Sequence, residues 1–545
     1  MLDPFCEYYA DFLQGTYDCV DRVVLNAYFP MGGSPGGFRT WWRALYGTDD
    51  NLDNTHLMRL AGRFSRRMYG WAEKNKIPVI KCTANERPHA ALEEECPELP
   101  KRPGVFCVVV KRAPFPIWDV RRFGQGGIDL RKKKEPMPYV NHYAFHVLDK
   151  EWGHMIFKVC GHPPFTVQII VNGHEYVANA AGKQRLKFSK EDNCFTDFAN
   201  AAGLQKVADT LRSVNARGRL KQACAHWLYQ VCLCLALDVA EQEKSGFWYE
   251  LVTYQAEYSR NLLFQEGSTL EKVFQGVIDR TRAALDVKTV KTVFGRRQRG
   301  QHESRWEVVV ERPSYDLTVF KIHCGKLTLK MYSKGERVLR IEAIVHNTRV
   351  LGLSRRLEKI PEMVDRLQAL LERFLQVVRC VDVACLDDRT WEELPTPSQV
   401  GQARVAGVDM NKARTRAVLQ AVLALTVLPQ RWGSAALAAK VCAIRGWSPE
   451  KYQARHASYD LKKLRGKNLI HKDGRRYYEA SPAALQKITA LAILQDKVIK
   501  PVLAKATNPK SRKTPAVCGP IEAHYAAVQK EIAALCQALG LATAA

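Results

Sequence analysis

The strongest constraint on the fold of this chain lies in its last quarter, where three helical patterns are followed directly by a β-hairpin. The helices are expected in ARTRAVLQAVLALTVLP, SAALAAKVCAIRG and PEKYQARHASYDLKKLRGKN, the third with Ser448 as its cap and Pro449 at its first position. The hairpin LIHKDGRRYYEAS turns at Asp473 and Gly474, a pair that favours tight hairpins. This order of elements predicts a winged helix-turn-helix domain over residues 408–505.

Positive charge is concentrated in the same region. The chain has 545 residues and a formal net charge of +26, and residues 401–545 hold 24 Lys and Arg against 8 Asp and Glu, which is +16 of that total. A local surplus of this size repels itself without an anionic partner, so it predicts nucleic acid. The expected contacts are Lys451, Arg455, His456, Lys462, Lys463 and Arg465 on the third helix, and Lys472, Arg475 and Arg476 on the hairpin. The alternative is a helical bundle with a solvated basic face.

Duplex DNA is the favoured nucleic acid, because the deep major groove of RNA does not admit a helix. Residues 506–545 are expected to be a basic linker and a C-terminal helix. Two further basic segments predict contacts to a nucleic-acid backbone, although each is equally consistent with a solvated loop. Their central residues are Arg131, Lys132 and Lys133 in the first, and Arg296 and Arg297 in the second.

Neither a membrane nor the secretory pathway is indicated. No apolar run reaches the length of a spanning helix, and the first residues lack the basic start and cleavage pattern of a signal peptide. The 16 cysteines include no CxxC pair and are expected to be reduced thiols. We therefore expect a cytoplasmic protein. The sequence leaves its oligomeric state open.

Upstream of the basic domain, the periodicity predicts an α+β protein whose core carries a mixed or antiparallel sheet with helical insertions. Residues 1–104 are expected to be mostly helical, with a strand at 20–30, and residues 105–394 to form the core. NHYAFHVLDKEWGHMIFKVC predicts a hairpin, and TVQIIVNGHEYVANAAGK a strand that runs into a helix. Residues 197–286 are expected to be helical, which would place Glu257, Tyr258 and Arg260 on an aromatic-rich helix.

The stretch KMYSKGERVLRIEAIVHN at 330–347 predicts two strands joined by a tight turn. Lys330, Tyr332 and Lys334 share one face of the first strand, and Arg340 and Glu342 share one face of the second. In matching register, these side chains would offer a phosphodiester cations to hold it, a carboxylate for a metal ion and a hydroxyl to attack it. The alternative is a cross-strand salt bridge on an ordinary sheet face.

Several histidines and acidic residues are candidate metal ligands. His142 and His146 point to the same side of one predicted strand, and His174 lies at the corner that follows another. With Glu342 they form the candidate ligand set for Mg²⁺ or Mn²⁺, and the alternative is that they are hydrogen-bonded structural histidines. Asp21 opens an early strand, as the first carboxylate of an RNase H-like transposase would, with Asp119 and Glu342 as possible partners.

Several motifs occur together in a recognisable order, namely CVDRVVLNAYFP, NHYAFHVLDKEWGHM, PPFTVQIIVNGHEYVA, DNCF, QAEYSRNLLF, KMYSK…LRIE and SYDLKKLRGKNLI. Together they resemble a widespread family of bacterial proteins associated with mobile elements, and the resemblance covers most of the chain. It implies this architecture and a mobile-element context, but no particular reaction. Locally, Tyr-x-Lys followed by Leu-Arg-x-Glu is similar to a hairpin of rolling-circle replication initiators. In that class a tyrosine attacks a DNA phosphate with the help of a divalent metal ion.

The leading hypothesis is therefore a mobile-element protein that nicks or transfers DNA strands with the help of a metal ion. Tyr332 would be the nucleophile or a phosphate ligand, and Lys330 and Lys334 would clamp the phosphate. Arg340 would stabilise the transition state, and Glu342 would bind the metal ion. The alternative is a non-catalytic DNA- or RNA-binding protein, either a regulator or a ribonucleoprotein component. An RNA-associated enzyme is a third possibility.

Overall fold

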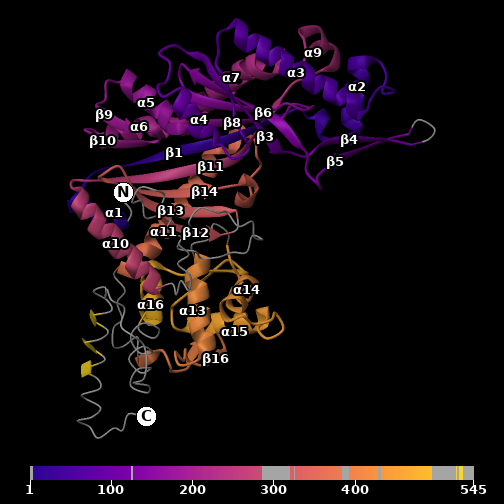
Figure 1. The fold of residues 1–545 in the computed structure, drawn as a ribbon. Helices are drawn as coiled ribbons and strands as arrows, with labels where there is room; N and C mark the ends of the chain where they lie inside the picture. Colours follow the sequence, from indigo (N-terminus) through magenta and orange to yellow (C-terminus); the bar gives the residue numbers. More distant parts are fainter. Residues whose placement is uncertain are drawn as a thin grey trace.

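The computed structural model describes residues 4–123, 127–284, 319–324, 326–382, 392–426, 431–493, 523, 524, 527, 528, 530 and 531. In this part of the chain, ten strands form one large sheet in the order β12-β13-β14-β11-β1-β8-β7-β6-β3-β2 (Figure 1). β2 and β3 are parallel, and the other neighbouring strands are antiparallel. The protein is thus α+β with a mixed sheet, which confirms the predicted fold class.

The large sheet consists of β1 Leu13–Tyr28, β2 Val79–Lys81, β3 Gly104–Pro114, β6 Tyr139–Asp149, β7 Gly153–Cys160, β8 Val167–Asn172, β11 Glu250–Phe264, β12 Val319–Cys324, β13 Leu327–Lys334 and β14 Val338–Val345. Four two-stranded ribbons accompany it. They are β4 Ile117–Arg122 with β5 Ile128–Lys133, β9 Phe188–Glu191 with β10 Cys194–Phe198, β15 Ser398–Val400 with β16 Ala403–Val405, and β17 His471–Asp473 with β18 Tyr477–Glu479.

Helices gather around both halves of the large sheet (Figure 1). Those around the β6–β8 half are α2 Pro35–Tyr46, α3 Asn54–Lys74, α4 Pro88–Glu95, α5 Gly173–Lys183, α6 Ala201–Asp209, α7 Val214–Leu228, α8 Cys234–Ala236 and α9 Val239–Ser245. Those around the β11–β14 half are α1 Pro4–Tyr8, α10 Gly267–Ala284, α11 Ile360–Asp382, α13 Ala413–Thr426, α14 Ser434–Arg445, α15 Ala454–Gly466 and α16 Pro482–Ile493. No single described helix has the length and apolar composition of a membrane span. One sharply bent pair, Val214–Ala236 with Val239–Ser245, passes that test only when its parts are joined.

The prediction of helix for residues 197–286 is wrong between Glu250 and Phe264, which form β11 at the centre of the sheet. Both faces of this strand are buried over its second half, so it lacks the exposed–buried alternation that marks a surface strand. Its glutamate, glutamine, arginine and leucine residues also have good helix propensity, which the pairing with β1 and β14 overrides.

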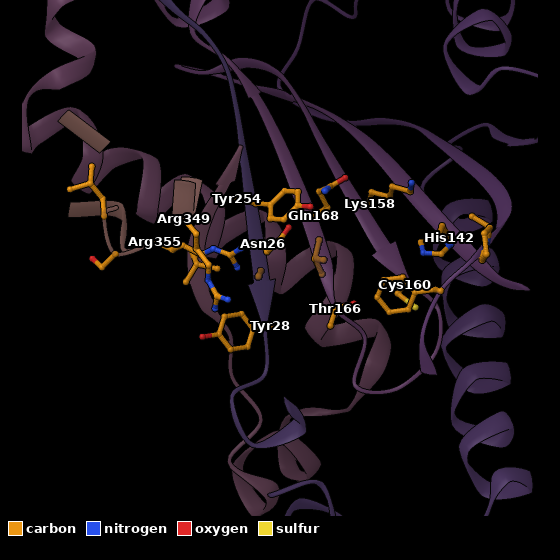
Figure 2. A pocket seen from close by; sticks show the side chains of 18 residues that line it. Asn26, Tyr28, His142, Lys158, Cys160, Thr166, Gln168, Tyr254, Arg349 and Arg355 are labelled. Carbon is orange, nitrogen blue, oxygen red and sulfur yellow. The ribbon is translucent and has the colours of Figure 1, made fainter. Parts of the chain in front are cut away.

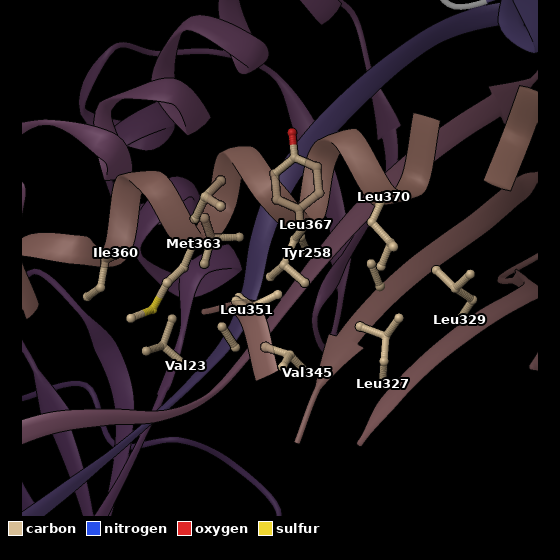
Figure 3. Packing of buried hydrophobic residues seen from close by; sticks show 14 of the residues in the cluster. Val23, Tyr258, Leu327, Leu329, Val345, Leu351, Ile360, Met363, Leu367 and Leu370 are labelled. Carbon is tan, nitrogen blue, oxygen red and sulfur yellow. The ribbon is translucent and has the colours of Figure 1, made fainter. Parts of the chain in front are cut away.

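One face of the large sheet is packed by helices. α3 covers the β6 end, where Phe64 lies 5.3 Å from the Tyr143 ring and Trp71 lies 6.1 Å from the Phe145 ring. α11 covers the β11–β14 end, where Leu367 is fully buried and packs in the same apolar cluster as Val345 (Figure 3). Because alternate residues of a strand point to opposite faces, the side chains between these positions face away from α3 and α11. On that opposite face, Leu92 of α4 packs on Cys107 and Val109.

The C-terminal elements form in the predicted order, but the third helix was predicted to begin too early. It begins at Ala454 with Gln453 as its N-cap, not at Pro449 with Ser448 as its cap, because residues 449–453 form a turn. α13, α14 and α15 are followed by the β17–β18 hairpin, in the order expected for a winged helix. α14 ends at Gly446, whose φ of +63° is the left-handed conformation that glycine adopts without strain. α16 contacts α10, α11 and α13, so the C-terminal helices join the core through a packed contact.

Candidate functional site

The two strands of the predicted ribbon, β13 and β14, pair in the register that the sequence suggested. Tyr332 lies opposite Arg340, and Lys330 lies opposite Glu342. The Tyr332 hydroxyl donates a hydrogen bond of 2.6 Å to Glu342, and the Lys330 ammonium lies 3.8 Å from the same carboxylate. The five predicted side chains are therefore on one face of the sheet, with Lys334 at the end of the row.

The centre of this face is dry. Arg340 is 0% exposed and Glu342 is 3% exposed. All three nitrogens of the guanidinium donate hydrogen bonds: Nε to Glu342 at 2.6 Å, Nη2 to Asp21 at 2.5 Å, and Nη1 to the Asn193 carbonyl at 2.5 Å. Nη1 is also 3.3 Å from the Asn261 side chain. With each nitrogen engaged inside the protein, Arg340 has none left to offer a substrate phosphate.

The β9–β10 hairpin covers this cluster. Its turn residue Asn193 donates from its side chain to both oxygens of Asp21, at 2.9 and 3.1 Å, and accepts from the Lys334 ammonium. His174, the first-turn residue of α5, places Nδ1 3.3 Å from Asp21, although the geometry is too poor for a hydrogen bond. The predicted corner at His174 thus meets the predicted ribbon through Asp21.

A β-bulge in β1 explains how Asp21 reaches Arg340. Val20 pairs with Tyr258 and Val23 with Ala256, so both Asp21 and Arg22 lie opposite Glu257. A bulge of this kind turns a side chain out of the ordinary alternation of the strand. It brings a third carboxylate, Glu257, near those of Asp21 and Glu342.

The charged side chains of the cluster shift one another's pKa values. Burial acts to raise the pKa of Asp21, but Arg340 and His174 hold it well below its ordinary value. Burial, with Asp21 and Glu342 nearby, raises the pKa of Glu257 to about 7 against the opposing effect of Arg22.

Burial also raises the pKa of Tyr332 well above its ordinary value, and Glu342 adds to the effect despite the opposing charge of Arg340. A phenol in that state is protonated at neutral pH and is a poor nucleophile. The geometry favours the cross-strand ion network over the phosphate site. Lys330 and Lys334 retain partial exposure at its rim.

Of the predicted metal ligands, His142 and His146 lie far from Glu342, whereas His174 lies beside Asp21 in the same cluster as Glu342. His142 and His146 are on β6, five strands from Glu342 on β14, which corresponds to roughly 24 Å at the usual strand spacing. The His146 ring is hydrogen-bonded to His154 at 3.0 Å, and burial lowers the pKa of His146 to about 3. Among the residues that the structure describes, no group of three or more His, Cys, Asp or Glu side chains is arranged to hold a metal ion.

The other predicted residues have varied surroundings. Asp119 lies on the β4–β5 hairpin, which projects from the molecule in Figure 1, and it accepts a hydrogen bond from Asn54, so it is not beside Asp21. Arg131, Lys132 and Lys133 are exposed on the same hairpin. Arg131 pairs with Asp129, and Lys132 lies over the Trp118 ring. Arg296 and Arg297 lie outside the described residues.

The C-terminal cations face outward. Lys451 was predicted to lie on the third helix, but it is in the turn before α15. The exposed cations are Lys451, Arg455 and Lys462, and at the hairpin Lys472, Arg475 and Arg476, while His456, Lys463 and Arg465 are half-buried. Behind them, Ala457, Leu461 and Leu464 are buried against the other helices. None of the six exposed cations forms an ion pair with another residue in the described part of the chain.

Sequence reasoning missed one feature, a cavity of about 850 Å³ on the sheet face opposite α3 (Figure 2). Its residues come from β1, β3, β6, β7, β8 and β11 and from the segment between β14 and α11. No local sequence pattern joins segments so far apart.

Scanning protein-family models, curated proteins and solved structures gave no match to this chain.

Proposed function

We propose that this protein binds duplex DNA through a C-terminal winged helix made of α13, α14, α15 and the β17–β18 hairpin. The observation that carries the proposal is the set of six exposed cations without ion-pair partners among the described residues. Unpaired cations on one rigid surface neutralise DNA phosphates and release bound counterions.

The exposed face of α15 has the spacing of a groove-binding helix. Arg455, Ser458, Tyr459 and Lys462 are all exposed, and they recur at intervals of three and four residues along one side of the helix. A helix with such a face enters the major groove of DNA, and the hairpin lies against the adjacent backbone. Such a domain fits either a regulator or a DNA-processing protein of a mobile element. We also propose that the protein is cytoplasmic.

The proposal is tested by titrating a labelled duplex with the full chain. We expect the double variant Arg455→Gln/Lys462→Gln to bind at least about tenfold more weakly, because it loses two charge-assisted contacts. The matched control is Arg66→Gln/Lys74→Gln, which removes the same charge from exposed positions on α3. If both double variants bound the duplex equally weakly, the binding would depend on net charge alone, which would contradict a DNA-binding surface on the winged helix. Stronger binding to duplex RNA than to DNA would favour the RNA-associated alternative.

Metal-dependent strand cleavage is the second candidate. It is favoured by the carboxylates of Asp21, Glu257 and Glu342, which lie near one another on one sheet face with two lysines at the rim. It is opposed by the burial of Arg340 and by the finding that no group of described residues is arranged to hold a metal ion. Labelled DNA incubated with Mg²⁺ or Mn²⁺ separates the possibilities. A covalent adduct that is absent in Tyr332→Phe supports a tyrosine nucleophile. Cleavage without an adduct, absent in Glu342→Gln, supports an activated water. Binding without cleavage leaves the DNA-binding protein.

A further inference from the structure

The cavity on the sheet face opposite α3 has a polar floor that spans three strands. Asn26 on β1 pairs with Gln168 on β8, and Gln168 pairs with Lys158 on β7, so their side chains form a row (Figure 2). Tyr254 on β11 joins this row through a β-bulge. Val24 pairs with Gln255 and Leu25 with Thr253, so Tyr254 between them has no pairing partner on β1. The cavity volume of about 850 Å³ lies within the range of small-molecule sites.

The wall of the cavity is cationic. Arg349 and Arg355 come from the segment between β14 and α11, and Lys158 on β7 is the third basic side chain of the cavity. Burial and the nearby Lys111 lower the pKa of Lys158 from its ordinary value. The described lining contains no aspartate or glutamate. Neither Arg349 nor Lys158 forms an ion pair with another described residue. Like charges that share a cavity without a counter-ion repel one another, so the cavity is suited to an anion.

Arg355 supplies independent evidence of a missing partner. Its Nη2 donates to Asn347 at 2.9 Å, and its guanidinium carbon lies 5.6 Å from the centre of the Tyr254 ring. Its Nε is buried and has no hydrogen-bond partner among the described residues. Burial and the nearby Arg349 also lower the pKa of Arg355. A phosphate oxygen would satisfy the unpaired donor and relieve the repulsion.

Flat rings and amides adjoin these cations. Tyr254, Tyr28 and Phe115 line the cavity and offer apolar ring surface. Asn26 and Gln168 each carry both a donor and an acceptor, which is the pattern that reads the edge of a nucleic-acid base. Base stacking on aromatic side chains, with cations along the phosphate backbone, is how many proteins hold single-stranded nucleic acid.

We propose that this cavity binds a nucleotide, with its phosphate on Arg349 and Arg355 and its base over Tyr254 and the Asn26–Gln168 row. The ligand is either a free nucleotide or one unit of a single-stranded nucleic acid, since both present the same phosphate and base. The proposal goes beyond duplex DNA binding by α15 and does not depend on it, because the two sites share no residue.

The experiment measures binding of two probes to the full chain, adenosine monophosphate by calorimetry and a fluorescein-labelled deoxythymidylate hexamer by anisotropy. Arg349→Gln is the main variant because Arg349 is exposed and its replacement leaves the core intact. Lys158→Gln is the second. Arg356→Gln is the matched control, since Arg356 is an exposed neighbour that lines a different cavity.

We expect at least one probe to bind saturably, about tenfold more weakly to Arg349→Gln and Lys158→Gln, and within about twofold of wild type to Arg356→Gln. Binding of the mononucleotide identifies a free nucleotide as the ligand, and binding of the hexamer alone identifies a single-strand unit. Absence of binding by either probe, or equal weakening in all three variants, overturns the proposal. Unchanged duplex DNA binding in Arg349→Gln shows that the other site is intact.

Discussion

At the scale of single residues, Arg340 links two carboxylates that come from distant parts of the chain. Its contacts to Asp21 and Glu342 are both in the buried interior. Removing one partner of such a network leaves uncompensated charge without water, and this costs more than the pair itself contributes. The side chain therefore holds β14 to β1 across β11, whatever reaction or ligand the protein serves.

Arg340→Met is expected to lower the free energy of unfolding by about 3–5 kcal/mol, because Asp21 and Glu342 then repel each other in a dry site. Urea unfolding of the variant and of wild type measures the difference, with Arg356→Met as the exposed control. Adding Asp21→Asn to Arg340→Met is expected to recover part of the loss, since one of the unpaired charges is then removed. A loss below about 1 kcal/mol, the value of an exposed pair, would contradict the buried network.

The raised pKa of Glu257 predicts how the stability of the protein depends on pH. Its pKa rises from 4.5 to about 7 in the folded protein, so the folded state binds more protons than the unfolded state between these values. Stability due to this group is then present below pH 4.5 and is lost as the pH rises through 7. Glu257→Gln keeps an acceptor for the Gln255 amide, which donates to Glu257 at 2.6 Å, and removes the charge.

We expect Glu257→Gln to be more stable than wild type by about 2–3 kcal/mol at pH 8 and nearly equal to it at pH 4.5. Denaturation midpoints measured from pH 4 to 8 test this. Parallel profiles for the two proteins would show that Glu257 does not titrate near pH 7.

A feature of the site could be predicted from the sequence where it depends on contacts between residues that are close in the chain. The pairing of Tyr332 with Arg340 was predictable, because a tight turn sets the register of the two strands. The burial of Arg340 was not, because it depends on Asn193, which is 147 positions away. Asp21 was recognised as a candidate, but only the bulge opposite Glu257 places it beside Arg340.

At the scale of elements, the helix α15 and the hairpin β17–β18 are expected to contribute differently to DNA binding. The residues of α15 face the base edges if the helix enters the major groove, whereas Arg475 and Arg476 at the hairpin tip contact phosphates. Cations that contact phosphates contribute affinity without sequence information, and side chains at base edges contribute discrimination.

Arg475→Gln/Arg476→Gln is therefore expected to weaken binding equally for preferred and random duplexes, and to reduce the slope of log K against log salt by about 2. Arg455→Gln is expected to weaken the preferred duplex more than the random one. Anisotropy titrations at four salt concentrations provide both quantities, once selection from a random pool has identified a preferred duplex. Loss of discrimination in the hairpin variant, with discrimination kept in Arg455→Gln, would reverse the assignment of the two elements.

At the scale of the whole molecule, the basic region is structurally continuous with the core. α11 packs on β11 and β14, α16 contacts α11, and α13 contacts α16, so packed helices link the large sheet to the first helix of the basic region. In Figure 1 the helices α13, α14 and α15 lie beyond the β12 edge of the sheet. Removing residues 401–545 would therefore uncover apolar surface of α11 in addition to removing charge.

This continuity separates two ways of removing the DNA-binding charge. A chain that ends at residue 400 is expected to unfold at a lower urea concentration than the full chain, because the buried α16 residues Leu485 and Ile488 no longer cover the core. A full chain with Gln at the six exposed cations is expected to keep its urea midpoint. Both proteins should lose most of the salt dependence of DNA binding, with the slope smaller by about 5 in the six-fold variant. An unchanged slope in the six-fold variant would remove the basis for a winged-helix interface, and an unchanged midpoint in the truncated chain would show that the core is complete without α16.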